Sequence, residues 1–276
     1  MYFVTGSSIP TVTGPVESYV AIGDSFTEGV GDPGPDGTFV GWADRLAGML
    51  AAQAPPGFRY ANLAVRGRLL GPIVAEQVPR ATALAPDLVT FCAGGNDILR
   101  PGSDPDALAE QYEKALVQLL TRVGTVVVCT GFDTRGVPVL RHLRGKIATY
   151  NTHLWALADR HHCPVLDLWS LRSVQERDAW SEDRLHLSAL GHERVARRCA
   201  EALGVEAAAP SSPVPPPAAL TAAPSLPAAG PRSPAAARRD DLHWARHHLL
   251  PWIGRRLRGQ SSGDHVEAKR PELLPL

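Results

Sequence analysis

The sequence predicts an α/β fold with a five-stranded parallel sheet, and three observations lead to this prediction. Over the first 205 residues, short runs rich in β-branched residues alternate with longer segments of helical periodicity. The alternation occurs five times, which is typical of strand–helix units that build a parallel sheet. Within one run, Val126, Val127 and Val128 are apolar on both faces, as expected of a strand that helices cover on each side.

Each expected element has a local signal. The segments predicted to be strands are 18–22, 59–63, 87–92, 125–130 and 164–168. The helical patterns cover 39–52, 71–82, 104–123, 139–161 and 188–203. The third helix is the best marked: Asp104 is an N-cap residue, Pro105 suits the first helical position, and Asp106 lies near the positive end of the helix dipole. Gly124 then ends this helix.

Polar segments follow four of the five expected strands. In an open parallel sheet, ligands bind beyond the carboxyl ends of the strands, so chemistry is expected in the segments that come next. These segments are Gly23–Gly29, Ala64–Gly67, Ala93–Asp97 and Glu182–Ser188, after strands one, two, three and five. The fold prediction therefore brings them together at one edge of the sheet.

Ser25 is the candidate nucleophile, because it occupies a tight strand-to-helix turn at that edge. A serine hydroxyl needs a base to take its proton and a third group to orient the base. Asp183 and His186 have suitable spacing for these roles, three residues apart just before a helix. The Ser25 amide, the Gly67 amide and the Asn96 carboxamide are candidate donors to the negative oxygen that forms on an attacked carbonyl.

The four segments, taken together and in this order, resemble the SGNH hydrolases, also called the GDSL esterase/lipase family. The resemblance rests on GDSFTEG at 23–29, Asn62-x4-Gly67, GGND at 94–97 and Asp183-x-x-His186. It covers roughly residues 15–205, and Phe26 stands where the family's name has leucine.

This resemblance implies a three-layer α/β/α sandwich with a flavodoxin-like sheet. It also implies that Ser25 is the nucleophile, His186 the base and Asp183 the group that orients the base. The corresponding oxyanion hole consists of Ser25, Gly67 and Asn96.

The expected function is hydrolysis of a small-molecule carboxylic ester through an acyl-enzyme on Ser25, without a metal ion or an organic cofactor. The sequence does not define the natural ester or the length of its acyl group. Two alternatives stay open. The same triad could transfer the acyl group to an acceptor other than water, or the chain could be a catalytically silent interaction protein that acts through a basic C-terminal helix.

Composition limits the remaining function classes. Among 276 residues, 28 Lys and Arg balance 28 Asp and Glu, and no apolar run approaches the roughly 20 residues of a membrane-spanning helix. The N-terminus lacks the features of a secretory signal, which favours a cytoplasmic location. The four cysteines have no spacing typical of a zinc or redox site. A near-neutral isoelectric point argues against nucleic-acid binding.

Charge and composition divide the chain after residue 206. Residues 1–206, the expected hydrolase domain, carry 19 basic against 23 acidic residues, whereas residues 207–276 carry nine against five. Nine Pro and twelve Ala make 207–237 an expected semi-rigid linker. Residues 238–259 have a basic amphipathic helical pattern that could dock on the domain, mediate self-association, bind a partner or contact a membrane surface. Residues 260–276 are expected to be disordered.

A second basic segment follows the fourth expected strand. Its basic residues are Arg135, Arg141, His142, Arg144 and Lys146. One interpretation is a solvated basic face. The other is that these residues, with Arg66 and Arg68, attract an acidic or phosphate-bearing ester.

Overall fold

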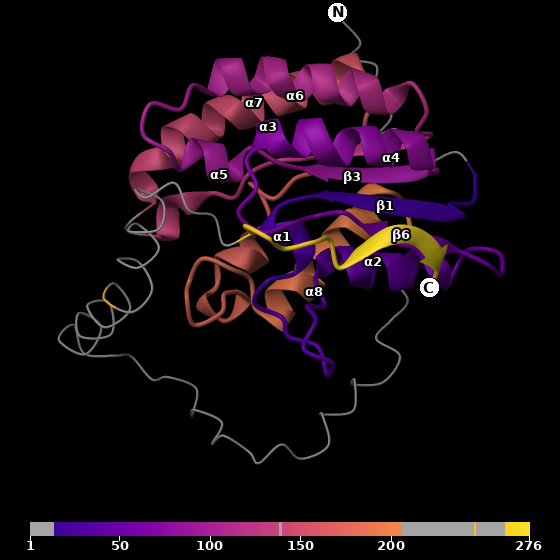
Figure 1. The fold of residues 1–276 in the computed structure, drawn as a ribbon. Helices are drawn as coiled ribbons and strands as arrows, with labels where there is room; N and C mark the ends of the chain where they lie inside the picture. The colour runs from indigo at the N-terminus through magenta and orange to yellow at the C-terminus, as the bar shows by residue number, and fades with distance from the viewer. Residues whose placement is uncertain (1–13, 138–139, 206–245, 247–262) are drawn as a thin grey trace, which may run out of the picture.

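The computed structural model of the chain describes residues 14–137, 140–205 and 263–276, together with the single residue 246. Figure 1 shows these residues as a central sheet between two layers of helices. The linker expected over 207–237 lies outside the described residues, and so does the amphipathic segment expected over 238–259, apart from residue 246.

The sheet has the strand order β5-β4-β3-β1-β2-β6. Its five parallel strands are β1 (Ser18–Gly23), β2 (Arg59–Asn62), β3 (Leu88–Cys92), β4 (Thr125–Cys129) and β5 (Val165–Leu166). The order of these five strands is that of a flavodoxin-like sheet, so the predicted fold class is confirmed. In the register of β1 and β3, Gly23 lies opposite Cys92, and both strands end at the same edge of the sheet.

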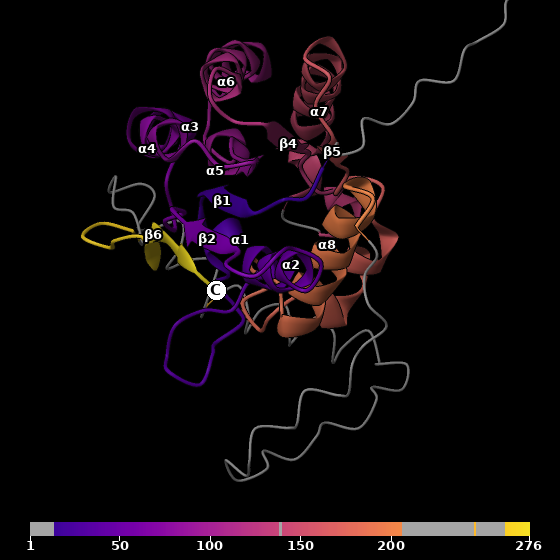
Figure 2. The same cartoon turned by 90° about the vertical axis from the view of Figure 1, so that its right-hand side faces the viewer.

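Helices cover both faces of the sheet, as Figures 1 and 2 show. One layer contains α3 (Leu70–Pro72), α4 (Val78–Leu84), α5 (Gly95–Ile98), α6 (Pro105–Leu120) and α7 (Arg144–Arg160). The other contains α1 (Ser25–Glu28), α2 (Trp42–Ala51) and α8 (Ala189–Ala202). The side chains of β1 alternate between the layers, with Val20 and Ile22 in one core cluster and Tyr19 and Ala21 in the other.

Local signals explain where the helices begin. The Asp104 side chain accepts a hydrogen bond from the Asp106 amide at 3.0 Å, and Pro105 opens α6. The pattern expected from residue 139 becomes helical only at Arg144, after a 3₁₀ turn over Arg141–Leu143. Among the residues that the structure describes, no helix is both long and apolar enough to cross a membrane.

The helix expected over 71–82 is irregular. Between α3 and α4 it widens into a π-helical segment over Ile73–Gln77. Pro79 has no N–H to donate to the preceding turn, so a regular α-helical ladder cannot continue through this position. Such π-helical turns often occur at functional sites, and this one faces the end of β1 through Gln77.

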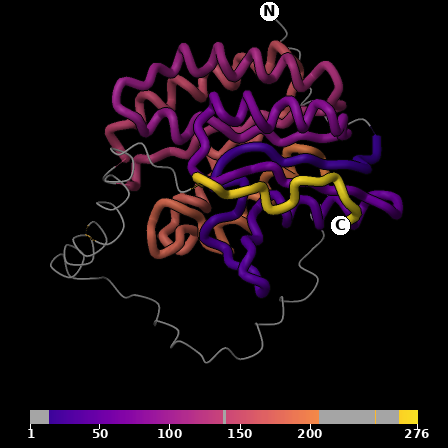
Figure 3. Tube along the Cα trace, in the orientation of Figure 1, coloured from indigo at the N-terminus to yellow at the C-terminus, as the bar shows by residue number. Residues whose placement is uncertain are grey.

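The C-terminal residues contradict one expectation. Disorder was expected over 260–276, but the described residues 263–276 end in a strand, β6 (Arg270–Pro275), that pairs antiparallel with β2. Figure 3 shows this last segment, in yellow, along the edge of the sheet. The expectation was wrong because the ordering comes from hydrogen bonds to a strand far away in the sequence, which local composition does not reveal. The sheet therefore has six strands rather than five.

Candidate active site

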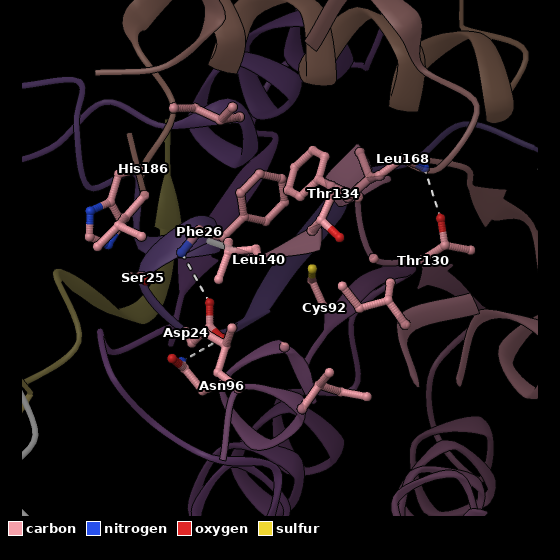
Figure 4. Close-up of a pocket in the computed structure, with 18 of the residues that line it drawn as sticks. Asp24, Ser25, Phe26, Cys92, Asn96, Thr130, Thr134, Leu140, Leu168 and His186 are labelled. Atoms are coloured by element: carbon pink, nitrogen blue, oxygen red, sulfur yellow. Dashed lines mark hydrogen bonds between the residues drawn. The ribbon is translucent and has the colours of Figure 1, made fainter. Parts of the chain in front are cut away.

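Ser25 is the first residue of α1 and lines a pocket at the carboxyl edge of the sheet, shown in Figure 4. The preceding residue, Asp24, is the N-cap of α1, and its Oδ1 accepts a hydrogen bond from the Phe26 amide at 3.1 Å. Its Oδ2 accepts a second hydrogen bond from Asn96 Nδ2 at 2.9 Å. The Asp24 carboxylate thus fixes the turn that presents Ser25 and joins it to the segment after β3.

Gly23 and Gln77 set the backbone just before this turn. A Cβ at Gly23 would lie 2.5 Å from the Cys92 carbonyl oxygen, so only glycine permits this approach of β1 to β3. The buried Gln77 carboxamide accepts from the Gly23 amide at 2.8 Å and donates to the Gly23 carbonyl at 2.9 Å. Together these contacts fix the backbone conformation at the end of β1.

Asp183 and His186 form a tight pair in the loop before α8. His186 Nδ1 lies 2.6 Å from Asp183 Oδ2, which leaves the imidazole Nε2 for another partner. Asp183 Oδ1 accepts from the Ser181 hydroxyl at 2.7 Å and from the Leu185 and His186 amides at 2.9 Å each. Burial acts to raise the pKa of Asp183, but these hydrogen bonds and the His186 charge outweigh it and hold the pKa well below its usual range.

Gly31 allows the His186 loop to approach the serine turn. A Cβ at Gly31 would lie 2.1 Å from the Leu187 carbonyl oxygen and 3.2 Å from His186 Cβ, and its φ of +103° favours glycine. His186 and Ser25 both line the pocket, and Figure 4 shows them at the same end of it. Two glycine contacts, at residues 23 and 31, therefore bring the predicted nucleophile and base to one place.

The two other oxyanion candidates differ in position. Asn96 lines the pocket beside Ser25, and its Nδ2 donates to Asp24 and to the Arg68 carbonyl at 3.1 Å. Gly67 belongs to the neighbouring loop and has a left-handed φ of +74°. The structure thus gathers Ser25, Asn96 and His186 in one pocket, with Gly67 in a loop that a hydrogen bond connects to Asn96.

The pocket extends from Ser25 into the domain and has a volume of about 210 Å³. Figure 4 shows Ser25 and His186 at one end and Thr130 and Leu168 at the other. Aromatic contacts form part of the wall. The centroid of the Phe132 ring lies 5.1 Å from that of Phe26 and 5.4 Å from that of Trp180. The remaining wall is largely apolar and includes Cys92, Ile98, Val137, Leu140, Ile147 and Leu187.

Acidic partners pair with four of the seven basic residues that could attract an anionic ester. The buried Asp133 carboxylate pairs with Arg144 at 2.7 Å and with Arg135 at 2.6 Å. The hydrogen bond from Arg144 is the main cause that lowers the pKa of Asp133 to about 2, against an opposing effect of burial, and Arg135 adds to it. Arg66 pairs with Glu28 and Arg68 with Glu76. Such pairing disfavours the attraction of an anionic ester by these four arginines, two of which share the Asp133 carboxylate.

Four supporting residues have no counterpart among the sequence predictions of the site. They are Gln77, Glu28, His192 and Lys269. Only Glu28 had a signal in the sequence, because it belongs to the GDSFTEG segment.

Within the described residues, no three or more His, Cys, Asp or Glu side chains gather in a way that could hold a metal ion.

Comparisons with known proteins agree with this architecture. A flavodoxin-like sandwich with a serine after the first strand and an Asp–His pair before the last helix is typical of SGNH-type ester hydrolases. The model of the GDSL-like lipase/acylhydrolase family matches residues 21–194, and the chain belongs to this family of ester-bond hydrolases.

Solved structures give the same fold. A catalytic mutant of Axe2, an acetylxylan esterase from Geobacillus stearothermophilus, is similar with a TM-score of 0.60 at 21% identity over 71% of this chain and 98% of that one. LAE5, an alpha/beta hydrolase from the metagenome of Lake Arreo, has a TM-score of 0.56 at 22% identity over 68% and 95%. Other Axe2 structures carry catalytic mutations of an aspartate and of a histidine three positions later. No protein of curated function matches the chain.

Proposed function

We propose that the protein cleaves carboxylic esters through an acyl-enzyme on Ser25, with His186 as base and Asp183 as its orienting group. The observation that carries this proposal is the 2.6 Å Asp183–His186 pair at the same pocket as Ser25. The described catalytic mutations of Axe2, at a serine, an aspartate and a histidine three positions later, support it by analogy.

The chemistry follows from the geometry. His186 Nε2 takes the Ser25 hydroxyl proton while Oγ attacks the ester carbonyl carbon, and the Asp183 carboxylate stabilises the imidazolium. The imidazolium then gives this proton to the leaving alcohol. In the second half-reaction His186 takes a proton from water as the water oxygen attacks the acyl-enzyme carbonyl. The bond to Ser25 Oγ then breaks, the imidazolium returns the proton to this oxygen, and the acid is released.

The oxyanion is stabilised by the Ser25 amide, the Gly67 amide and Asn96 Nδ2. Without substrate, Asn96 Nδ2 donates to Asp24 and to the Arg68 carbonyl. We therefore expect Asn96 to redirect or share one of these N–H groups when the charge develops on the substrate.

The shape and character of the pocket favour an ester with an apolar acyl chain. Beyond Ser25, a chain would pass between Phe26 and Leu140 towards Leu168, and an acetyl group would leave this length of pocket empty. Burial of each additional methylene against such a wall contributes about 0.8 kcal/mol. Binding and turnover should therefore improve as the acyl chain grows from acetyl to medium length.

The test compares the wild type with Ser25→Ala on p-nitrophenyl esters of increasing chain length, together with fluorophosphonate labelling. We expect the wild type to be labelled and to prefer butyryl and longer chains over acetyl. Ser25→Ala should lose both labelling and turnover, whereas Ser170→Ala, at an exposed serine outside the pocket wall, should retain both. Undiminished turnover by Ser25→Ala would disprove the nucleophile, and a strict acetyl preference would disprove the apolar acyl site.

A further inference from the structure

The C-terminal segment, residues 263–276, reaches the part of the molecule that carries Ser25 and Gly67. Figure 1 shows it in yellow, running from the neighbourhood of α1 along the edge of the sheet. Lys269 lies just before β6, and its side chain is only 13% exposed. Its Nζ donates to the Glu28 carbonyl at 2.6 Å, to the Phe39 carbonyl at 2.8 Å and to Asp44 Oδ2 at 2.6 Å. All three donors of the ammonium group are therefore satisfied.

Glu28, which Lys269 holds by its backbone, connects the serine helix to the loop of Gly67. The Glu28 side chain is only 4% exposed, and its carboxylate accepts from the Arg66 amide at 2.6 Å and from Arg66 Nε at 3.0 Å. The Arg66 guanidinium also lies over the Phe39 ring, 4.9 Å from its centroid. Lys269 thus fixes the backbone of both residues that hold Arg66.

Gly263 lies against the same loop at the carbonyl group of Arg66. A Cβ built at Gly263 would lie 1.9 Å from the Arg66 carbonyl oxygen and 3.1 Å from the Arg66 carbonyl carbon. These two atoms and the Gly67 nitrogen belong to one planar peptide unit. Glu28 therefore restrains Arg66 at its amide, and the C-terminal segment packs against its carbonyl. Both contacts restrain the orientation of the peptide unit that carries the Gly67 N–H.

We propose that residues 263–276 position the Gly67 amide for oxyanion stabilisation, through Lys269 and Gly263. This inference rests on the proposed function, because it takes Gly67 as an oxyanion donor. Lys269 and Gly263 are positioning residues, since neither lines the pocket. A segment that served only to cover the exposed edge of β2 would need no more than β6. The contacts of Gly263 and Lys269 both lie before β6 and involve the loop of Gly67 and the residues that hold it.

The test uses two substitutions in the full-length chain, Gly263→Ala and Lys269→Met. Gly48→Ala and Lys114→Met are matched controls at exposed helical positions. The Cβ added at residue 48 meets nothing within 4 Å. The measurements are kcat and KM for a p-nitrophenyl ester, the inhibition constant of a trifluoromethyl ketone, which forms an oxyanion on the nucleophile, and the thermal midpoint.

We expect kcat to fall on the order of ten- to a hundredfold in both variants with little change in KM, because a displaced oxyanion donor acts only in the transition state. The inhibition constant of the trifluoromethyl ketone should rise by a similar factor, because the inhibitor mimics that state. The controls should keep the wild-type values. A loss of stability alone would not raise the inhibition constant of the folded fraction.

Three outcomes would overturn the inference. One is wild-type kcat and inhibition in both variants. Another is a loss of activity that matches the loss of folded protein, with unchanged inhibition of the remainder. The third is an increase in KM without a change in kcat. The Ser25→Ala variant distinguishes a failure of this inference from a failure of the proposed function. If Ser25→Ala is inactive and Gly263→Ala is fully active, only the positioning role is rejected. If Gly263→Ala does not fold, Lys269→Met decides the same question.

Discussion

His192 should make the protein less stable in mild acid, and its hydrogen bonds explain why. The ring is completely buried, its Nδ1 lies 3.2 Å from the Trp42 amide, and its Nε2 lies 3.3 Å from the Val30 carbonyl oxygen. Nδ1 must accept from the Trp42 N–H, so the ring is neutral with its proton on Nε2. Protonation would direct a second N–H at the Trp42 amide, which has no acceptor to offer.

The size of the effect follows from the pKa. Burial is the main cause that lowers the pKa of His192 from 6.5 to about 4, and the nearby charges of Arg45 and Lys269 lower it further. Because the folded state binds this proton less readily than the unfolded state, stability is complete above the unfolded pKa and decreases as the pH falls towards the folded pKa. The total loss is roughly 3 kcal/mol, of which about 2 kcal/mol occurs between about pH 7 and pH 5.

Urea denaturation of the wild type and His192→Asn at these two pH values tests this explanation. Asparagine keeps an acceptor for the Trp42 amide and does not titrate, so the variant should be less stable at neutral pH but lose about 2 kcal/mol less on acidification. His142→Asn, at an exposed histidine, should follow the wild type at both pH values. Equal losses in the wild type and His192→Asn would refute the assignment of this pH dependence to His192.

Two further predictions concern the position of His186. Asp183→Asn should lower kcat on the order of 10⁴-fold at neutral pH, because an amide cannot stabilise the imidazolium or the required tautomer. Steady-state kinetics measure this loss, and an unchanged thermal midpoint shows that the variant is folded. Gly31→Ala should lower kcat at least about tenfold, because its Cβ would lie 2.1 Å from the Leu187 carbonyl and displace the His186 loop. Gly136→Ala, where the added Cβ meets nothing within 4 Å, is its control, and equal rates in the two variants would contradict the argument.

Periodicity predicted the fold wherever burial alone decides the structure. The central strands β1 and β4 were located within about a residue, because their side chains are buried on both faces and leave a continuous apolar signal. The segment over 141–143 was expected to be helical in the same way, but its side chains contribute no buried residue, and it forms a 3₁₀ turn instead. The strand β6 could not be predicted, since its ordering depends on its pairing with β2.

Some residues of the candidate site could likewise be predicted from the sequence, and others could not. Ser25, Asn96 and His186 could be placed at one pocket because each follows a strand of a parallel sheet. Gln77 could not, because a glutamine within a helical pattern has no sequence feature that distinguishes a surface residue from one that holds Gly23. For the same reason, the basic residues could be interpreted either as a solvated face or as a site that attracts an anionic ester. Their partners, such as Asp133, become visible only when the loops are folded against each other.

The segment GDSFTEG at 23–29 does more than supply the candidate nucleophile. Each of the two central blocks bonds to a different residue of it: Asn62 Nδ2 donates to the Thr27 carbonyl at 3.0 Å, and Asn96 Nδ2 donates to Asp24 Oδ2 at 2.9 Å. The Arg66 amide donates to Glu28 at 2.6 Å, and the ammonium of Lys269 donates to the carbonyl of the same Glu28.

The residues around Ser25 are therefore the common partner of the segments after β2 and β3 and of the C-terminal segment. This arrangement explains why blocks that are each a weak signal become specific together, because the first block forms hydrogen bonds with both the second and the third. The C-terminal segment, far away in the sequence, likewise contacts Glu28 and Arg66, and Arg66 directly precedes the candidate oxyanion donor Gly67.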